Sequence, residues 1–113
     1  MAKFERRLNG NFDSLLHTLD KEILGGSISA SFQDGSDFIA GNVRCAVRVY
    51  ERYSAIGKSR LGANITLLGT GDNLSLSIIT AGGSQAMFFK VNTWGEEAFA
   101  KKIVQIVDKW MTK

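Results

Sequence analysis

The sequence predicts a single α+β domain in which two helices pack on one face of an antiparallel sheet of five to six strands. Helical hydrophobic patterns flank residues 26–92, where apolar and polar residues alternate as they do in half-buried strands. Gly-rich turn signals interrupt this alternation, and the chain contains no proline. With 113 residues, 44% of them hydrophobic, the chain has the size of one ordinary domain, so we assign residues 1–113 to a single domain.

The two helices are predicted over residues 11–24 and 94–111, because apolar residues recur there at helical spacing. Asn11 is expected to cap the first helix. Thr93 and Glu96 have the spacing of a capping box for the second helix. The apolar stripes are Phe12, Leu15, Leu16, Leu19 and Ile23 in the first helix, and Phe99, Ile103, Val107 and Trp110 in the second.

Turn signals divide the central segment into strands. The pair Asp34-Gly35 predicts a two-residue hairpin, after which residues 37–53 form one long strand. The remaining connections are a loop at residues 54–60 and turns at residues 69–72 and 81–84. Residues 3–8 are the candidate for a sixth strand. The resulting cross-strand pairs are Phe32–Asp37, Val49–Ile65, Leu67–Leu74, Leu76–Phe89 and Ile78–Met87.

The phase of the long strand decides which of its side chains face the helices. With Ile39 inside, the odd-numbered residues as far as Val49 point inward, and Cys45 is a small core residue. The even-numbered residues then face away from the helices, with no clear acidic partner. Together with two residues across the sheet they form what we call the basic-aromatic patch: Arg44, Arg48, Tyr50, Arg52, Phe88 and Lys90.

This predicted surface has three interpretations. The preferred one is a non-enzymatic binding or assembly module that forms a homo-oligomer through its sheet, because Leu68, Ile79 and Phe88 would gain from being covered. The second is binding of RNA or another single-stranded nucleic acid, since arginine and lysine neutralise phosphates while aromatic rings stack on bases. The third is a solvated face on which arginine stems cover the aromatic rings.

Motifs for catalysis are lacking. His17 is the only histidine and is expected to face solvent, and Cys45 is the only cysteine. A metal site of His and Cys ligands, or a nucleophile activated by histidine, is therefore not expected. Helix capping explains the adjacent Glu96 and Glu97 without acid-base catalysis. We predict no enzymatic activity, no metal and no cofactor.

Charge and hydropathy set further expectations. The net charge of +3 and pI near 9.2 are only mildly basic and do not by themselves indicate nucleic-acid binding. The apolar runs are far shorter than the ~20 residues of a membrane helix. The basic start of the chain continues into an amphipathic helix pattern, unlike a signal peptide. We therefore expect a cytoplasmic protein without a membrane partner.

The order of a strand, a helix, several antiparallel strands and a long closing helix resembles that of TATA-binding-protein-like and helix-grip folds. The chain lacks the two-fold internal repeat of a TATA-binding protein, so the resemblance does not imply DNA kinking. The chain also resembles a small uncharacterised bacterial family through the segments Ala-Gly-Gly-Ser at 81–84 and Thr-Trp-Gly-Glu-Glu at 93–97. That resemblance implies no activity.

The helix-grip resemblance implies one more alternative, a small apolar ligand held between the closing helix and the sheet. The residues expected to line such a cavity are Phe32, Met87, Phe89, Phe99 and Trp110. A packed core is the stronger expectation, because a domain of this size has few apolar residues to spare from its interior.

Overall fold

The computed structural model describes residues 1–25, 30–54, 59–82 and 89–112. Within these residues it contains five strands and two helices, which confirms the predicted α+β class. The elements are β1 (Ala2–Asn9), α1 (Phe12–Gly25), β2 (Ser31–Ala40), β3 (Val43–Ser54), β4 (Ser59–Thr70), β5 (Asn73–Gly82) and α2 (Phe89–Met111). Neighbouring strands are antiparallel, and their order across the sheet is β1-β5-β4-β3-β2.

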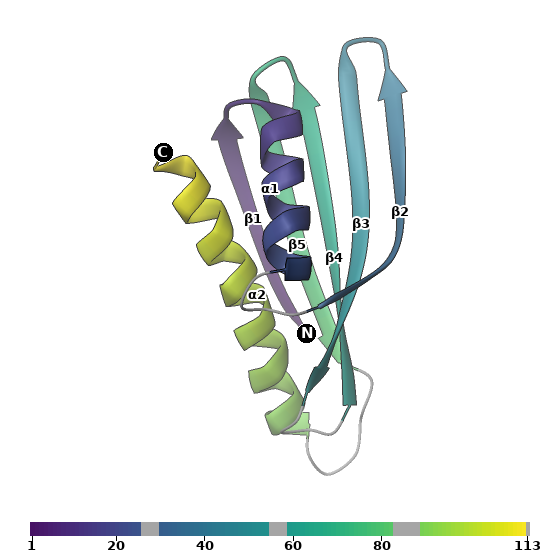
Figure 1. Ribbon diagram of the computed structural model, residues 1–113, viewed down its shortest axis with the longest axis vertical. Coiled ribbons are helices and arrows are strands. Elements are labelled where there is room, and N and C mark those ends of the chain that lie inside the picture. The colour runs from purple at the N-terminus through teal and green to yellow at the C-terminus, as the bar shows by residue number, and fades with distance from the viewer. Residues whose placement is uncertain (26–29, 55–58, 83–88, 113) are drawn as a thin grey trace.

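Both helices pack on the same face of the sheet, so the domain has two layers (Figure 1). α2 packs on β5, β1 and β4, and α1 lies beside α2. β2 and much of β3 lie beside α1, on the side away from α2, where neither helix covers them (Figure 1). We call the side with the helices the inner face and the opposite side the open face, because no described helix or strand covers it.

α1 begins where the sequence predicts. Oδ1 of Asn11 accepts the backbone N–H of Ser14 at 2.8 Å, and the Asn11 carbonyl accepts that of Leu15 at 3.1 Å. These bonds confirm Asn11 as the N-cap. His17 is exposed, as predicted. The buried residues of the helix are Phe12, Leu15, Leu19 and Ile23.

α2 begins at Phe89, earlier than predicted. Glu96 therefore lies inside the helix, and the predicted capping box is wrong. The Glu96 side chain accepts the N–H of Gly82 and the amino group of Met1, and the residue is only 5% exposed. Its role is to join α2 to the ends of two strands. Neither described helix is both long and apolar enough to cross a membrane.

β1 occupies the edge of the sheet beside β5. The sequence analysis placed a strand after the turn at residues 81–84 in this position and paired Leu76 with Phe89. That prediction is wrong, because the partner of Leu76 at this edge is Arg6 of β1, and Phe89 begins α2. Met87, the predicted partner of Ile78, lies outside the described residues. Pairing with β1 from Ala2 to Asn9 leaves β5 no free edge along this length.

The hairpin turns differ from those predicted at one decisive place. Two-residue turns begin at Gly41, between β2 and β3, and at Gly71, between β4 and β5, and these glycines have φ of 61° and 59°. The predicted hairpin at Asp34-Gly35 is wrong, since both residues lie within β2. There Oδ1 of Asp34 accepts the N–H of Gly35 at 2.8 Å beside a register shift. The shift leaves Gln33 as the extra residue of a β-bulge directly before the Asp-Gly pair.

The turn at Gly41 reverses the predicted phase of β3. Across this two-residue turn Ile39 pairs with Arg44, so these two residues share a face. Ala46 and Tyr50 are each only 1% exposed, and the even-numbered residues of β3 therefore face the helices. The predicted inward direction is wrong for Val43, Cys45, Val47 and Val49.

β4 and β5 have the predicted faces. Leu67 pairs with Leu76, not with Leu74, and a shift of two residues leaves the direction of every side chain unchanged. The odd-numbered residues of β4 and the even-numbered residues of β5 thus meet the helices. The centre of the core consists of Leu61, Ala63, Ile65, Leu67, Leu74, Leu76, Ile78, Phe99, Ile103 and Val107.

Candidate functional site

The predicted basic-aromatic patch does not form on the open face. Phe88 lies outside the described residues, and Lys90 belongs to the first turn of α2 and not to a strand. The four remaining members lie on the inner face of β3: Arg44, Arg48, Tyr50 and Arg52. The cations on which the nucleic-acid interpretation depended are therefore on the wrong side of the sheet.

Arg44 pairs with Asp13 at the start of α1. Nη1 and Nη2 each donate to one carboxylate oxygen at 3.0 Å, and the guanidinium carbon lies 4.2 Å from the centre of the Phe12 ring. Both contacts are favourable for a planar cation. The hydrogen bonds from Arg44 hold the pKa of the Asp13 carboxyl below its usual value, and the same bonds raise the pKa of Arg44.

Arg48 fastens β2 to β3. Nη2 donates to the two carboxylate oxygens of Asp37 at 3.0 and 3.2 Å, and Nη1 donates to the carbonyls of Val47 at 2.9 Å and Ser36 at 3.3 Å. The side chain passes over Gly35, where an added Cβ would lie 3.0 Å from Cδ of Arg48. Because its guanidinium already bonds within the sheet, Arg48 is poorly placed to hold a phosphate.

Tyr50 is buried beneath α1. Its hydroxyl donates to Oδ1 of Asp20 at 2.9 Å. Burial, together with this hydrogen bond, raises the pKa of Tyr50. Phe32 of β2 packs edge-on against the Tyr50 ring, with 5.9 Å between the ring centres. Tyr50 thus connects α1 with β2 and β3.

Arg52 reaches toward α2. Its guanidinium carbon lies 5.8 Å from the centre of the Phe99 ring. Nη1 is buried and has no hydrogen-bond partner among the described residues. Phe99 itself is fully buried, so Arg52 lies at the border of the core. Like the other three side chains, Arg52 makes its contacts on the inner face.

The open face is apolar along β3 from Val43 to Val49 and at one large residue of each neighbouring strand, Phe38 of β2 and Leu68 of β4. Phe38, Cys45 and Leu68 form one row across these strands, and Val49 pairs with Asn64 and not with the predicted Ile65. Phe38 is 62% exposed and Leu68 42% exposed, while the outward residues of β3 are half-buried by their neighbours. We call this surface the open-face cluster: Phe38, Val43, Cys45, Val47, Val49 and Leu68.

Charged residues border the open-face cluster without interrupting it. Glu51 and Arg60 form an ion pair of 3.1 Å toward one end of β3 and β4. Uncharged polar residues lie beside cluster residues in the same rows: Ser75 follows Leu68, and Ser36 and Thr66 flank Val47. Cys45 is half-exposed within the cluster, which corrects its predicted core position. The charged residues next to the cluster are Asp34, Glu51 and Arg60, and Lys3, Glu5 and Arg7 lie farther away on β1, beyond β5.

Sequence reasoning missed the open-face cluster, although a signal for it was present. A Gly-Asn pair at 41–42 is a hairpin signal. With the turn placed there, Val43 changes side relative to Ile39, and the apolar residues of β3 become outward-facing. Three or more His, Cys, Asp or Glu side chains placed to hold a metal ion are not found in the part of the chain that the structure describes.

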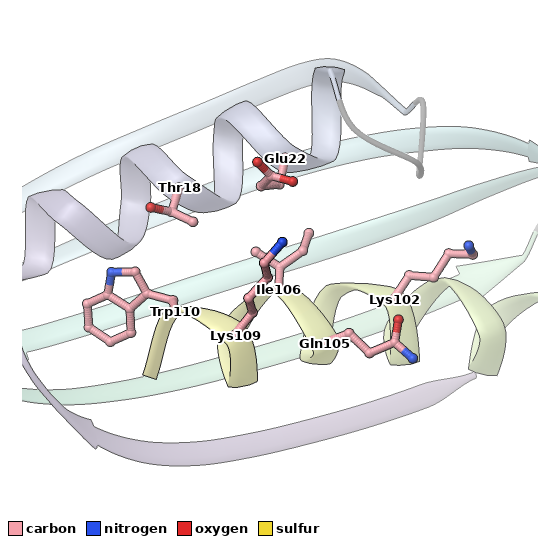
Figure 2. A pocket seen from close by; sticks show the side chains of 7 residues that line it. All are labelled: Thr18, Glu22, Lys102, Gln105, Ile106, Lys109 and Trp110. Carbon is pink, nitrogen blue, oxygen red and sulfur yellow. The ribbon is translucent and has the colours of Figure 1, made fainter. Parts of the chain in front are cut away.

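A groove of about 260 Å³ runs between the two helices (Figure 2). Trp110 lies at one end, where Nε1 donates to Oγ of Ser14 at 3.1 Å and the ring packs on Gly10. The other lining residues are Thr18 and Glu22 of α1 and Lys102, Gln105, Ile106 and Lys109 of α2. Its polar groups are mostly the ends of long surface side chains, so no fixed ligand geometry is built there.

The fold defines a small two-layer α+β domain in which the helices cover one sheet face and no described element covers the apolar cluster on the other. The chain belongs to the family of unknown function DUF6054, whose model matches residues 1–111. This membership confirms the expected relationship to an uncharacterised family. No curated protein and no solved structure matches the chain. Bacterial origin and the helix-grip resemblance stay predictions.

Proposed function

We propose that this domain is a non-enzymatic assembly module in which two copies associate through the open-face cluster. The observation that carries the proposal is the composition of β3. Its outward positions from Val43 to Val49 are all apolar, whereas a strand with one solvated face places polar residues outside. Contiguous exposed apolar surface of this kind typically marks an interaction site.

The size of the open-face cluster supports a weak, reversible interface. From Val43 to Val49 the cluster is about 23 Å long at roughly 3.3 Å per residue, and three strands about 4.8 Å apart are about 14 Å wide. This is roughly 320 Å² per partner, and about 640 Å² in total lies in the range of weak, transient interfaces. The proposed dimer is therefore expected to dissociate on dilution.

The second copy is the favoured occupant because the cluster is complementary to itself. A two-fold interface brings the same patch from both molecules together, and an uncharged apolar patch does so without like-charge contacts. With the axis along β3, Phe38 of one copy faces the partner's Leu68, since both lie in the row of Cys45. Stacked sheets lie about 10 Å apart, which leaves room for these side chains to interdigitate.

Two other interpretations lose their structural basis. Nucleic-acid binding by the basic-aromatic patch required Arg44 and Arg48 to face outward, but both are paired on the inner face. A ligand beneath α2 required aromatic residues lining a space, but Phe99 is fully buried in the core. The proposal retains a cytoplasmic location, where reducing conditions keep Cys45 as a thiol.

Sedimentation equilibrium tests the proposal. The wild-type mass should rise with concentration from the 12.4 kDa of one chain toward twice that value. Leu68→Glu places a charge in the cluster and should keep the protein monomeric. Ile39→Glu is the matched control, because Ile39 is 74% exposed but lies on the inner side of β2. A wild type that stays monomeric throughout, or equal dissociation by both variants, would refute the proposal.

A further inference from the structure

A second unassigned feature lies on the inner face, where β2 and β3 extend past α1. A groove of about 630 Å³ runs along this side of the helix. Its lining residues are Asp13, Leu16, His17, Asp20 and Leu24 of α1, Phe32 of β2 and Arg48 of β3. The groove lies on the opposite side of the sheet from the open-face cluster, so it stays accessible in the proposed dimer.

The groove has an apolar wall on each side. Leu16 and Leu24 line it from α1, and Phe32 lines it from β2. Leu24 is 38% exposed and Phe32 is 48% exposed. Phe32 is held in place by its edge-on contact with Tyr50, which is itself bonded to α1. The wall on β2 is therefore preformed.

Among the described residues, the charges around the groove leave one carboxylate without an ion-pair partner. Arg48, the arginine that lines the groove, is neutralised by Asp37, and the lining residue Asp13 is paired with Arg44. Asp20 accepts only the neutral hydroxyl of Tyr50 among the described contacts, and none of the described ion pairs includes it. A carboxylate held by one hydrogen bond beside an exposed aromatic ring favours a cation.

We infer that the groove binds a small organic cation, a primary ammonium group on a short apolar chain. The ammonium group pairs with Asp20 and the chain lies against Leu16, Leu24 and Phe32. A groove of about 630 Å³ has the size of typical small-molecule sites. An anion of the same shape meets the Asp20 carboxylate, and Arg48, the arginine that lines the groove, is already paired with Asp37.

Hexylammonium and hexanoate are the matched probes, titrated separately at equal ionic strength and followed by ¹H–¹⁵N NMR of the full chain. Hexylammonium should shift the amide signals of residues 16–24 and 31–33 saturably. Hexanoate should leave them in place. Absence of saturable shifts with hexylammonium, or equal binding of hexanoate at the same signals, would overturn the assignment.

Asp20→Asn separates the charge from the fold, because the amide oxygen still accepts the Tyr50 hydroxyl. Hexylammonium should bind this variant about three- to fivefold more weakly, the effect of one partly exposed ion pair. Phe32→Ala, on the exposed edge strand, should also weaken binding. Asp72→Asn, in the β4–β5 turn, is the control and should bind as the wild type does. Unchanged affinity in Asp20→Asn would refute the role of this carboxylate.

Discussion

Tyr50 on β3 and Asp20 on α1 share a hydrogen bond of 2.9 Å, and this contact shows which face of β3 is inside. Tyr50 is an even-numbered residue of a strand whose odd-numbered residues are mostly apolar. A pattern that counts only hydrophobicity places the valines inside. The structure instead buries the tyrosine and supplies its hydroxyl with an acceptor, as a buried polar group requires.

Tyr50→Phe should lower the free energy of unfolding by about 1 kcal/mol, because Asp20 loses its donor while the ring still fills the same space. Urea denaturation at neutral pH measures the difference. Tyr53→Phe is the matched control, since Tyr53 is 63% exposed on the other side of the same strand. Equal stability of Tyr50→Phe and the wild type would contradict the inward position of Tyr50.

The Tyr50 hydroxyl also makes the free energy of unfolding depend on pH. Burial raises the pKa of Tyr50 in the folded protein above its ordinary value of 10.0, so the folded state holds this proton more tightly than the unfolded state. The stabilisation is complete below about pH 10 and is lost progressively as the pH rises above it. Tyr50→Phe should remove this part of the decline in alkaline urea denaturation. Parallel stability curves for the two proteins would show that Tyr50 titrates normally.

Arg44→Met should raise the pKa of Asp13 toward its ordinary value of 3.8, because the hydrogen bonds that lower it are lost. The low pKa in the wild type stabilises the fold above that value, and the effect disappears as the pH falls. NMR titration of the side-chain carboxyl carbon measures the shift directly. Arg60→Met, which breaks the Glu51 pair instead, should leave Asp13 unchanged.

Two glycines of β4 test the assignment of its faces. A Cβ on Gly69 would lie 2.6 Å from Cδ2 of Phe12 and 3.1 Å from Cδ2 of Leu74, so Gly69→Ala should cost about 1–3 kcal/mol through overpacking. A Cβ on Gly62 would point to the open face, with its nearest contact 3.9 Å away. Gly62→Ala should therefore be tolerated. Comparable decreases in the melting temperature of the two variants would show that the two positions are not on opposite faces.

The sequence was sufficient to predict the elements whose side chains follow a simple periodicity. The apolar stripe of α1 from Phe12 to Ile23 and the alternation in β4 and β5 repeat without conflict, so their buried faces were identified correctly. The predicted partner of Leu67 was wrong by two residues, but its predicted face was correct, because the side-chain period of a strand is two residues.

The phase of β3 could not be read in the same way. Valine at the outward positions resembles a core pattern, and arginine at the inward positions resembles a solvated one. The partners that make the inward arginines stable are Asp13 on α1 and Asp37 on β2, which no periodicity reveals. The candidate patch was therefore assigned to the wrong face, and its apolar counterpart was overlooked.

Reactivity of Cys45 shows directly whether a second copy covers the open-face cluster. As the only cysteine of the chain, it reports through its rate of reaction with a maleimide. We predict that this rate falls as the protein concentration rises, and that Leu68→Glu keeps the rate high at every concentration. A wild-type rate that is independent of concentration would contradict this prediction.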